Sequence, residues 1–359
     1  MKVLYDSEAF LQPFGGISRY YYNLLSNHGS LFDYTVSGKY SNNIYAPKIS
    51  SLKPFFPDKD FKGKHGLMKR FNAAADRKAI LKEDYDLFHA TYYEAPAYPK
   101  DKPVVITAHD FVHERYPQYY NDPSFLETKH ASFRTADRII AISENTKKDL
   151  LEFYPDISEN KITIVYHCQD WPLLKEITDA EKNHNPYILF TGSRNYYKNF
   201  EAFLKAAAPI MKKQKISLIC TGKPFSEFEQ NLISELGISD LIKAVFAKTN
   251  EDLQQYYNRA LLFVYPSLYE GFGFPILEAF ACGCPVLLSN TSCFPEIAGD
   301  AGIYFDPSSI ENMTEVLQNA LSSPSFCHDK VQKGYERVKR FTVDKTEKET
   351  AAVYRSLVR

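Results

Sequence analysis

The segment Tyr265–Glu278 carries two carboxylates on either side of a glycine turn. An apolar strand is predicted before the turn, and Pro275 suits the first position of the helix after it. The free amides and the positive dipole end of such a helix favour an anion. The turn itself consists of Gly271, Phe272 and Gly273.

Glu270 stands in this loop, and Glu278 falls about one turn into the predicted helix. Both carboxylates therefore border one crevice at the carboxyl end of a strand, where α/β proteins bind ligands. One carboxylate there could accept hydrogen bonds from sugar hydroxyls, and the other from a ribose diol. The alternative interpretation is a capped helix with a solvated Glu side chain.

A second connection between a strand and a helix, Thr191–Asn199, contains two cations. Arg194 and Lys198 could converge on a diphosphate, since Arg offers a fork of donors and Lys a point charge. Two cations in a loop are also common on a solvated surface, so the pattern leaves both interpretations open.

Two further segments in the first half of the chain could contact a ligand. Gly15 and Gly16 precede a helical pattern and would let the backbone approach a ligand closely, although a plain turn fits equally well. His109 follows the apolar run Val104–Ala108. A single His at the end of a strand is either structural or catalytic.

Four rival motifs are incomplete or misplaced. A dinucleotide fingerprint would need glycine in place of Ile276, and a P-loop would need other residues than Ser217 and Pro224. The triplet Asp84-Tyr85-Asp86 matches the metal-binding Asp-x-Asp of many sugar transferases, but it precedes a strand, so its carboxylates should face the other end of the sheet. No Gly-x-Ser-x-Gly elbow occurs.

Short apolar runs alternate with helical patterns along the whole chain, which predicts an α/β fold with parallel sheets and crossover helices. Residues 167–186 interrupt this alternation and are interpreted as a linker between two similar domains. The stretch Lys39–Arg70 is predicted to be a long loop or an excursion at the rim of the first domain. The predicted strands are Val3–Tyr5, Leu87–Ala90, Val104–Ala108, Arg138–Ile142, Ile162–Tyr166, Tyr187–Thr191, Ser217–Thr221, Ala244–Ala247, Leu262–Tyr265 and Pro285–Leu288. The predicted helices include Glu144–Phe153, capped by Ser143, and Phe200–Lys212, Ser226–Leu236, Asp252–Ala260 and Pro275–Cys282.

Composition excludes several classes of protein. The chain has 43 Lys and Arg against 44 Asp and Glu, so its net charge gives no drive toward nucleic acid. Aromatic residues make up 15%, which excludes a disordered chain. The six cysteines lack zinc-site spacing, and no apolar stretch approaches the roughly 18 residues of a membrane span.

The early Asp6 leaves no room for a signal-peptide core. We therefore expect a cytoplasmic protein with free thiols.

The stretch Asn258–Pro307 resembles family 4 glycosyltransferases of the GT-B type. It contains a Glu-x7-Glu element as Glu270 and Glu278, and then the blocks Ala281-Cys282-Gly283-Cys284-Pro285-Val286 and Pro295-Glu296-Ile297-Ala298-Gly299. Further landmarks occur in order: Gly15-Gly16, His109-Asp110, Ala141-Ile142-Ser143-Glu144, and Gly192 followed by Lys198-Asn199. The similarity covers essentially the whole chain and is nearest to bacterial mannosyltransferases that build surface polysaccharide.

This resemblance implies two Rossmann-like domains that face each other across a cleft. Residues 1–170 would bind the acceptor, and residues 171–344 would bind the nucleotide-sugar. The final segment, residues 345–359, would return to pack on the first domain.

The resemblance also implies roles for residues that hold the donor. Arg194 and Lys198 match the positions that hold its diphosphate, and the Gly15-Gly16 pair matches the backbone that touches the phosphates at Gly16. Glu278 matches the ribose-binding Glu.

Further implied roles concern the transferred sugar and the base. Glu270, with the amides of Phe272 and Gly273, matches the group that holds the sugar, and His109 matches a residue beside the anomeric centre. Where relatives often have an apolar residue and glycine near the base, this chain has Phe246-Ala247-Lys248. Lys248 is thus a candidate donor contact, and the base remains open.

The implied activity is transfer of a hexose with retention of configuration and without a metal. Mannose from GDP-mannose would pass to a glycan or lipid-linked acceptor in surface-polysaccharide assembly, with the nucleotide-sugar as substrate and no cofactor. The alternatives are a UDP-sugar donor, a sugar-binding partner whose catalysis has decayed, or a nucleotide-sugar epimerase.

The segment Phe55–Phe71 interleaves cations with aromatic residues. Such a pattern could contact anionic headgroups on the cytoplasmic face of the inner membrane, near a lipid-linked acceptor. The alternative is a solvated loop whose aromatic residues pack into the core.

Overall fold

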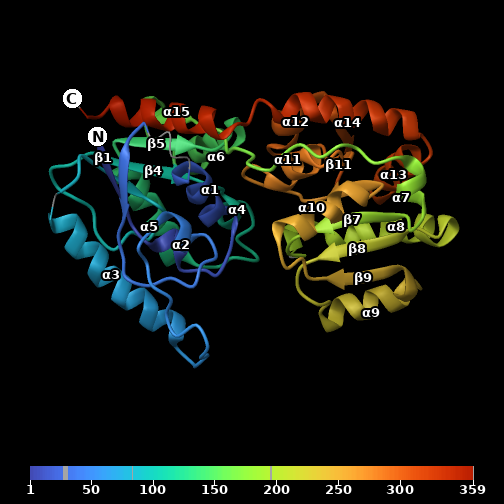
Figure 1. The fold of residues 1–359 in the computed structure, drawn as a ribbon, viewed down its shortest axis with the longest axis horizontal. Coiled ribbons are helices and arrows are strands. Elements are labelled where there is room, and N and C mark those ends of the chain that lie inside the picture. Colours follow the sequence, from blue (N-terminus) through green and yellow to red (C-terminus); the bar gives the residue numbers. More distant parts are fainter. Residues whose placement is uncertain (27–30, 83, 195, 359) are drawn as a thin grey trace. The chain divides into compact units, whose positions relative to one another are not determined.

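The computed structural model describes residues 1–26, 31–82, 84–194 and 196–358. The chain divides into two compact units, residues 1–170 with 341–359, and residues 171–340. Each unit is built on its own six-stranded parallel sheet flanked by helices (Figure 1). The chain re-enters the first unit at Phe341, slightly before the expected residue 345.

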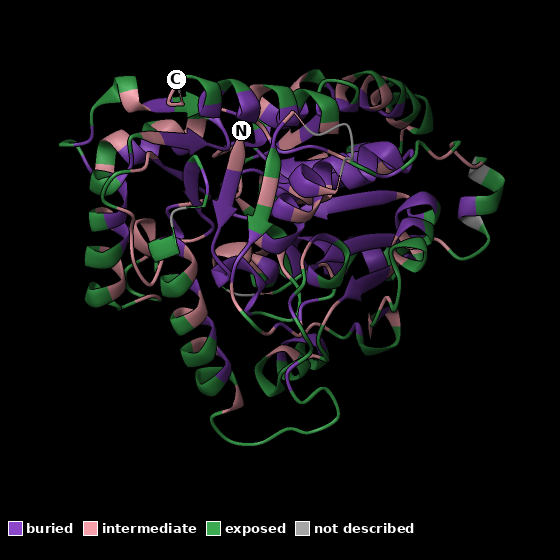
Figure 2. Cartoon of the chain, turned by 60° about the vertical axis from the view of Figure 1, so that its left-hand side comes forward, coloured by how far each residue is buried: buried purple, intermediate pink, exposed green. Residues whose placement is uncertain are grey.

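The sheet of the first unit has the strand order β2-β1-β3-β4-β5-β6, and all neighbouring pairs are parallel. Helices cover the faces of a parallel sheet, so its inner strands are buried on both sides and are continuously apolar. The inner strands are buried accordingly (Figure 2, purple). The strands are β1 (Lys2–Tyr5), β2 (Asp33–Val36), β3 (Leu87–Ala90), β4 (Val104–Ala108), β5 (Arg138–Ala141) and β6 (Ile162–Ile164).

The helices of the first unit are α1 (Gly16–Leu25), α2 (Ala46–Ile49), α3 (Lys64–Lys82), α4 (Val112–Arg115), α5 (Pro123–Thr135), α6 (Glu144–Phe153) and α15 (Val343–Arg355). Helix α6 has the predicted bounds, and the Ser143 side chain accepts a hydrogen bond from the Thr146 amide as its cap. Helix α15 joins the core of this unit through Tyr354, whose hydroxyl lies 2.7 Å from the Tyr5 hydroxyl.

The stretch Lys39–Arg70, predicted to be a long loop or an excursion at the rim, contains the short helix α2 and the start of α3 at Lys64, so a continuous loop is the wrong interpretation. The buried face of α3 includes Asn72 and Asp76, and these polar residues obscure the helical period of apolar residues. Asp76 accepts hydrogen bonds from the hydroxyls of Ser7 and Ser37, at 2.8 and 2.6 Å. Polar contacts therefore hold α3 against the loops that follow β1 and β2.

The sheet of the second unit has the strand order β12-β11-β10-β7-β8-β9, again entirely parallel. Its strands are β7 (Tyr187–Thr191), β8 (Ser217–Thr221), β9 (Ile242–Val245), β10 (Leu262–Tyr265), β11 (Val286–Ser289) and β12 (Gly302–Phe305). Its helices are α7 (Asp179–Asn183), α8 (Phe200–Gln214), α9 (Glu227–Glu235), α10 (Asn250–Arg259), α11 (Phe274–Ala281), α12 (Phe294–Ala298), α13 (Ile310–Leu321) and α14 (Pro324–Val338).

The edge strands are where sequence and structure differ most. Strands β2 and β12 were not predicted, and β9 ends at Val245 rather than at Ala247. Strand β2 is largely exposed, so it lacks the apolar run that marks an inner strand. The early end of β9 leaves Phe246 in the following loop, where it is exposed.

Two expectations about the whole chain can be compared with the structure. All six cysteines are free thiols, as expected. In the part of the chain that the structure describes, no helix is both long and apolar enough to cross a bilayer.

Candidate active site

The second unit has its topological switch point at β7, which pairs with β10 on one side and β8 on the other. Loops that leave neighbouring strands at such a point diverge and open a crevice at the carboxyl edge of the sheet. The loops after β7 and β10 contain Lys198 and Glu270 respectively. The fold thus brings the two predicted segments to the same edge.

Lys198 and Glu270 form an ion pair at this switch point. The Lys198 Nζ donates to Glu270 Oε1 at 2.5 Å, and the two side chains are only 13% and 14% exposed. The ammonium also lies over the rings of Tyr197 and Tyr265, at 4.9 and 5.5 Å from their centroids. The predicted diphosphate cation and the predicted sugar carboxylate are therefore direct neighbours.

The loop that carries Glu270 is anchored by Ser292, a residue with left-handed backbone (φ 55°) after β11. The Glu270 amide donates to Ser292 Oγ at 3.1 Å, and the same hydroxyl donates to the Glu270 carbonyl at 2.6 Å. From the other side, the Leu268 amide donates to the Tyr197 carbonyl at 2.7 Å. These bonds fix the backbone on both sides of the carboxylate.

The glycine turn precedes α11 as predicted. Gly271 and Phe272 are buried, and the Cys293 thiol donates to the Phe272 carbonyl at 3.0 Å. Gly273 has φ 97°, and a side chain there would approach Ile276 to 3.0 Å. Glycine is therefore required at this position for both its backbone conformation and its small size.

Glu278 is buried on α11 with 5% exposure, so the alternative of a solvated carboxylate is wrong. Its Oε2 accepts a hydrogen bond from the Tyr257 hydroxyl at 2.8 Å. That hydroxyl also lies 3.1 Å from Thr191 Oγ1 at the end of β7. Burial, and next the Glu278 charge, hold the pKa of Tyr257 well above its usual range, so the phenol remains a donor to the carboxylate.

Arg194 is not placed as the sequence predicted. Its Nε donates to Glu229 Oε1 at 2.5 Å, and its Nη2 donates to the carbonyls of Lys223 and Pro224 at 2.8 and 2.9 Å. The side chain is 5% exposed, and its guanidinium lies over the ring of Phe225. Arg194 and Lys198 thus contact different groups and do not converge, because Arg194 ties the loop after β8 to the loop after β7.

Lys248 is exposed in the loop after the edge strand β9, and its backbone amide donates to Asp252 at 3.1 Å. Strand β8 separates β9 from β7 in the sheet. Lys248 therefore follows a strand that is two positions from β7 in the sheet, and its loop also carries the exposed Phe246.

The remaining predicted residues lie in the first unit and are described there. Gly15 precedes α1 with extended backbone, and a side chain there would make only an ordinary contact with Gln12 at 3.7 Å. Gly16 is the first residue of α1. Backbone conformation thus does not explain the glycine at position 15.

His109 follows β4 and is 4% exposed. Its ring stacks on His167 with centroids 6.1 Å apart. Burial lowers the pKa of His109 to about 4, with Lys129 adding to the effect and Asp110 opposing it. Within the described residues, the buried His109 Nε2 has no hydrogen-bond partner. His109 is thus a neutral imidazole with one buried nitrogen that lacks a partner in the described part of the chain.

Two family models match consecutive parts of the chain. Residues 14–170 match the model described as Glycosyltransferase Family 4, and residues 175–337 match the model described as Glycosyl transferases group 1. The chain belongs to glycosyltransferase family 4.

This glycosyltransferase is similar to known proteins over nearly its whole length. It is 25% identical to the O-antigen chain mannosyltransferase B of Escherichia coli, with 99% of this chain and 100% of that protein covered. Sucrose-phosphate synthase from Thermosynechococcus elongatus superposes with a TM-score of 0.79 at 20% identity, with 99% of this chain and 98% of that chain covered. Anabaena HepE, solved with UDP and glucose, superposes at 0.77 with 16% identity and 99% coverage of both chains. The GT-B fold, with its two Rossmann-like domains, is confirmed.

Three residues around the site of the glycosyltransferase were missed by sequence reasoning: Tyr257, Tyr265 and Ser292. Tyr257 contacts Glu278, Tyr265 is buried beside Lys198, and Ser292 anchors Glu270. A Tyr on a helix or in a strand is indistinguishable from a core residue by local pattern. The positive φ of Ser292 could not be predicted from the sequence. A serine rarely adopts this conformation, so its presence at a position does not indicate it.

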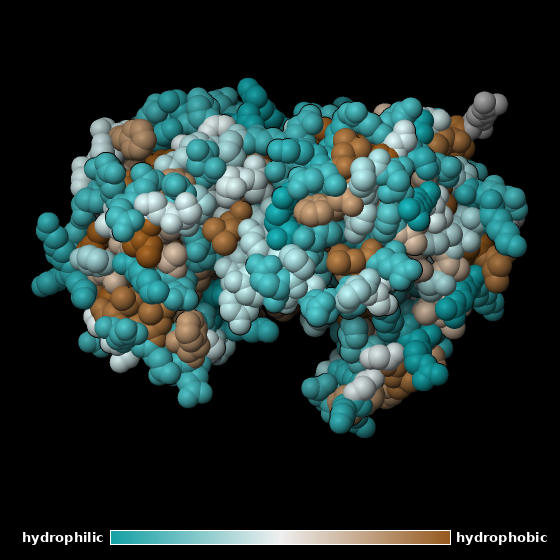
Figure 3. Space-filling model, turned by 180° about the vertical axis from the view of Figure 1, so that it is seen from behind, coloured by the Kyte–Doolittle hydropathy of each residue, from teal (hydrophilic) through white to brown (hydrophobic). Residues whose placement is uncertain are grey.

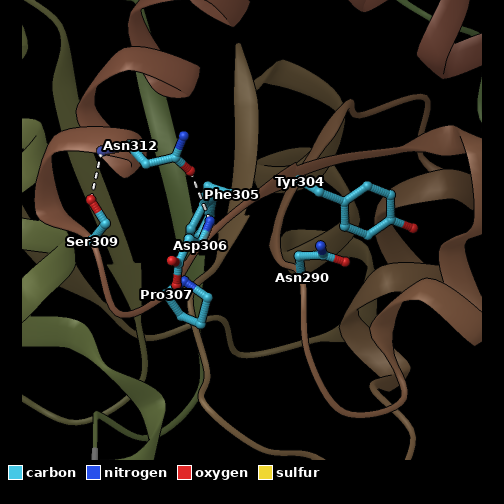
Figure 4. A pocket seen from close by; sticks show the side chains of 7 residues that line it. All are labelled: Asn290, Tyr304, Phe305, Asp306, Pro307, Ser309 and Asn312. Carbon is cyan, nitrogen blue, oxygen red and sulfur yellow. Dashed lines mark hydrogen bonds between the residues drawn. The ribbon is translucent and has the colours of Figure 1, made fainter.

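A cavity of about 510 Å³ lies in the second unit at the carboxyl ends of β11 and β12 (Figure 4). It contains none of the predicted residues and is lined by Asn290, Tyr304, Phe305, Asp306, Pro307, Ser309 and Asn312. The Asp306 carboxylate already accepts from Ser308, and the Asn312 side chain accepts from the Asp306 amide. Its polar groups are thus largely committed within the loop.

The Asp-x-Asp triplet of the glycosyltransferase lies at the amino end of β3, as predicted. Asp84 forms an ion pair with the Lys2 side chain at 2.7 Å, and Asp86 accepts from the Lys2 amide at 2.8 Å. These carboxylates stabilise the start of the sheet and lie at the opposite end from the carboxyl edge of its strands.

Proposed function

We propose that this glycosyltransferase transfers mannose from GDP-mannose, with retention of configuration and without a metal, to a glycan or lipid-linked acceptor in surface-polysaccharide assembly. The Lys198–Glu270 pair at the switch point of the second unit is the observation that carries the proposal. The similarity to the Escherichia coli mannosyltransferase supports mannose as the transferred sugar.

Lys198 is the proposed electrostatic partner of the donor diphosphate. Negative charge develops on the leaving nucleoside diphosphate, and a preorganised cation in a largely buried site stabilises it. Arg194 is engaged by Glu229, so the proposal assigns this role to Lys198 and to the amides at the start of α11. The acceptor hydroxyl would attack from the side of the leaving group, and a phosphate oxygen would take its proton.

The carboxylates hold the two ends of the donor in this proposal. Glu270, with the amides of Phe272 and Gly273, would bind hydroxyls of the transferred sugar, and the buried Glu278 would bind the ribose diol. Gly16 would let backbone approach the phosphates. His109, neutral at physiological pH, would lie beside the anomeric centre.

A UDP-sugar is the second candidate donor. The loop after β9 presents Phe246 and Lys248, both exposed, where family members contact the base. HepE, a solved structure of the same fold, was determined with UDP and glucose. A decayed, purely sugar-binding protein is less well supported, because the charged residues of the site are present and paired.

We further propose that the first unit contacts the cytoplasmic face of the inner membrane through the α3 tip, residues 56–71. The tip projects at the lower right of Figure 3 and carries five Lys and Arg against two Asp, in a chain of net charge −1. Phe56 and Phe71 are 50% and 44% exposed, and Phe61 packs edge-on against Phe56. Exposed rings among cations fit an anionic lipid surface.

Calorimetric titration with GDP, UDP and ADP, and with their sugar conjugates, tests the donor without added metal. Selective binding of GDP and GDP-mannose is the expected result. Preference for UDP would overturn the mannose assignment and leave the fold and mechanism intact. If no nucleotide bound, the decayed-partner alternative would replace the proposal.

A further inference from the structure

We propose that Glu270 makes the site discriminate the intact nucleotide-sugar from the bare nucleoside diphosphate. A phosphate that binds the Lys198 ammonium must first displace the Glu270 carboxylate from it. This inference rests on the proposed function of the same site. It assigns Glu270 a second task beyond sugar binding, namely to compete with the diphosphate for the ammonium.

The pair is closed in the protein without ligand. The 2.5 Å contact joins two side chains that are both more than four-fifths buried, so water offers little compensation for either charge. The buried Tyr265 hydroxyl is a further polar neighbour of the carboxylate and donates a hydrogen bond to it. Separation of the pair therefore leaves Glu270 without its cation in a largely dry environment.

Lys198 is the more mobile partner of the pair. The backbone of Glu270 is fixed on both sides by the bonds of Ser292 and by the bond between Leu268 and Tyr197. Lys198 carries its charge on a flexible four-carbon stem, so its ammonium can swing toward a phosphate. Binding of a diphosphate to Lys198 thus leaves the Glu270 carboxylate in place without its ion-pair partner.

The bare nucleoside diphosphate and the intact nucleotide-sugar differ in the hydrogen bonds that they can donate to Glu270. A bare nucleoside diphosphate neutralises Lys198 but leaves the carboxylate as an uncompensated buried charge, which is costly. The intact donor also brings sugar hydroxyls, and hydrogen bonds from these to an ionised carboxylate are strong. After transfer, Glu270 would recapture Lys198 and weaken the hold on the product.

Calorimetric titration of the wild type and of Glu270→Gln with GDP and GDP-mannose tests this inference; UDP and UDP-glucose are used if only UDP binds the wild type. Gln keeps the size of the side chain and removes the charge. We expect GDP to bind about tenfold more tightly to the variant, a change of about 1.4 kcal/mol. The nucleotide-sugar should gain nothing, so the preference for it should fall. The exposed Glu235→Gln on α9 is the matched control and should bind as the wild type does.

A second variant, Tyr265→Phe, acts in the opposite direction and does not depend on Glu270→Gln folding. It removes a neutral donor to the unpaired carboxylate, so GDP should bind more weakly while GDP-mannose is affected less. Equal GDP affinity of the wild type and both variants, with binding intact, overturns the inference and spares the proposed function. Absence of nucleotide binding to the wild type overturns both.

Discussion

Lys198 and Glu270 extend from the loops after two neighbouring strands, β7 and β10, and meet at 2.5 Å. In sequence they are separated by 72 positions, and each was singled out for a different part of the donor. If these residues bind the donor as proposed, their contact couples recognition of the phosphate to recognition of the sugar before any ligand arrives. It also identifies the cation on which catalysis should depend most.

Replacement of Lys198 with Ala should lower kcat/KM by about 10²–10³, the usual effect of removing one preorganised electrostatic group, or roughly 2.7–4 kcal/mol. Transferase assays with the preferred donor measure this change. Lys205→Ala on α8, whose exposed side chain pairs with Glu201, is the control and should retain wild-type rates. Near-normal turnover of the Lys198 variant would show that the diphosphate is stabilised elsewhere.

Exhaustive chelation with EDTA should leave the transfer rate unchanged, because the proposal assigns the leaving-group charge to Lys198 and to helix amides. The assay compares initial rates before chelation, after chelation, and after addition of excess Mg²⁺. A rate that collapses with EDTA and returns with Mg²⁺ contradicts the metal-independent mechanism.

Arg194→Ala should act mainly on stability. The substitution removes the guanidinium from two loop carbonyls and from the Glu229 carboxylate, which keeps its hydrogen bonds from Ser226. Breaking a buried ion pair costs about 3 kcal/mol. Chemical unfolding monitored by circular dichroism measures the loss. Arg194→Lys should restore little of it, since Lys cannot reproduce the fork that reaches three acceptors. A stable variant with a collapsed rate would return Arg194 to the diphosphate.

The sequence predicted the inner strands well because burial on both faces produces unbroken apolar runs, as in β4 and β7. It failed at β2, whose exposed residues follow no such run, and at α3, whose buried face carries Asn72 and Asp76. In these elements, stability comes from pairing with a neighbour or from long-range polar bonds. Neither leaves a local pattern.

The same limit applies to the site. Turn chemistry is local, so Gly273 and the carboxylates around it were placed on the correct loop. The partner of a charged side chain need not be near it in sequence. Glu229 lies 35 positions after Arg194 and forms an ion pair with it. Spacing alone shows two cations in one loop, but it cannot show that one of them forms an ion pair with a carboxylate on a distant helix.

Neutralisation of the exposed cations of the α3 tip should weaken binding to anionic vesicles. Each Lys or Arg near such a surface contributes about 1 kcal/mol, so replacement of Lys59, Lys62 and Arg70 with Gln should reduce binding at least about tenfold at low salt. Lys69 is left intact because Glu8 and Glu94 already engage it. Cosedimentation with vesicles that contain phosphatidylglycerol measures the effect.

The control for this experiment replaces three exposed lysines of the second unit, Lys205, Lys213 and Lys243, and so removes the same charge. It should bind vesicles as the wild type does. Equal loss in both variants would indicate a general charge effect, and no loss in the tip variant would remove the α3 tip as a membrane contact.

Glu8, which follows β1, should make stability depend on pH. It is buried beside two other acids, Asp6 and Asp76, while Lys69 lies 3.7 Å away and Glu94 adds further negative charge. Burial first, and then the charge of Asp6, raise the pKa of Glu8 to about 8. In the unfolded chain a Glu titrates near about 4.3. Between these values the folded state holds a proton that the unfolded state does not.

Stability from this group is therefore fully present below about pH 4.3 and is lost as pH rises through about 8. Glu8→Gln does not titrate, so its stability relative to the wild type should increase by about 1 kcal/mol or more between pH 5 and pH 8, since one pKa unit corresponds to about 1.4 kcal/mol. Urea unfolding at both pH values measures this, with the exposed Glu127→Gln as control. If the difference between the variant and the wild type were the same at both pH values, Glu8 would titrate alike in the folded and unfolded chain, and burial would not be holding its proton.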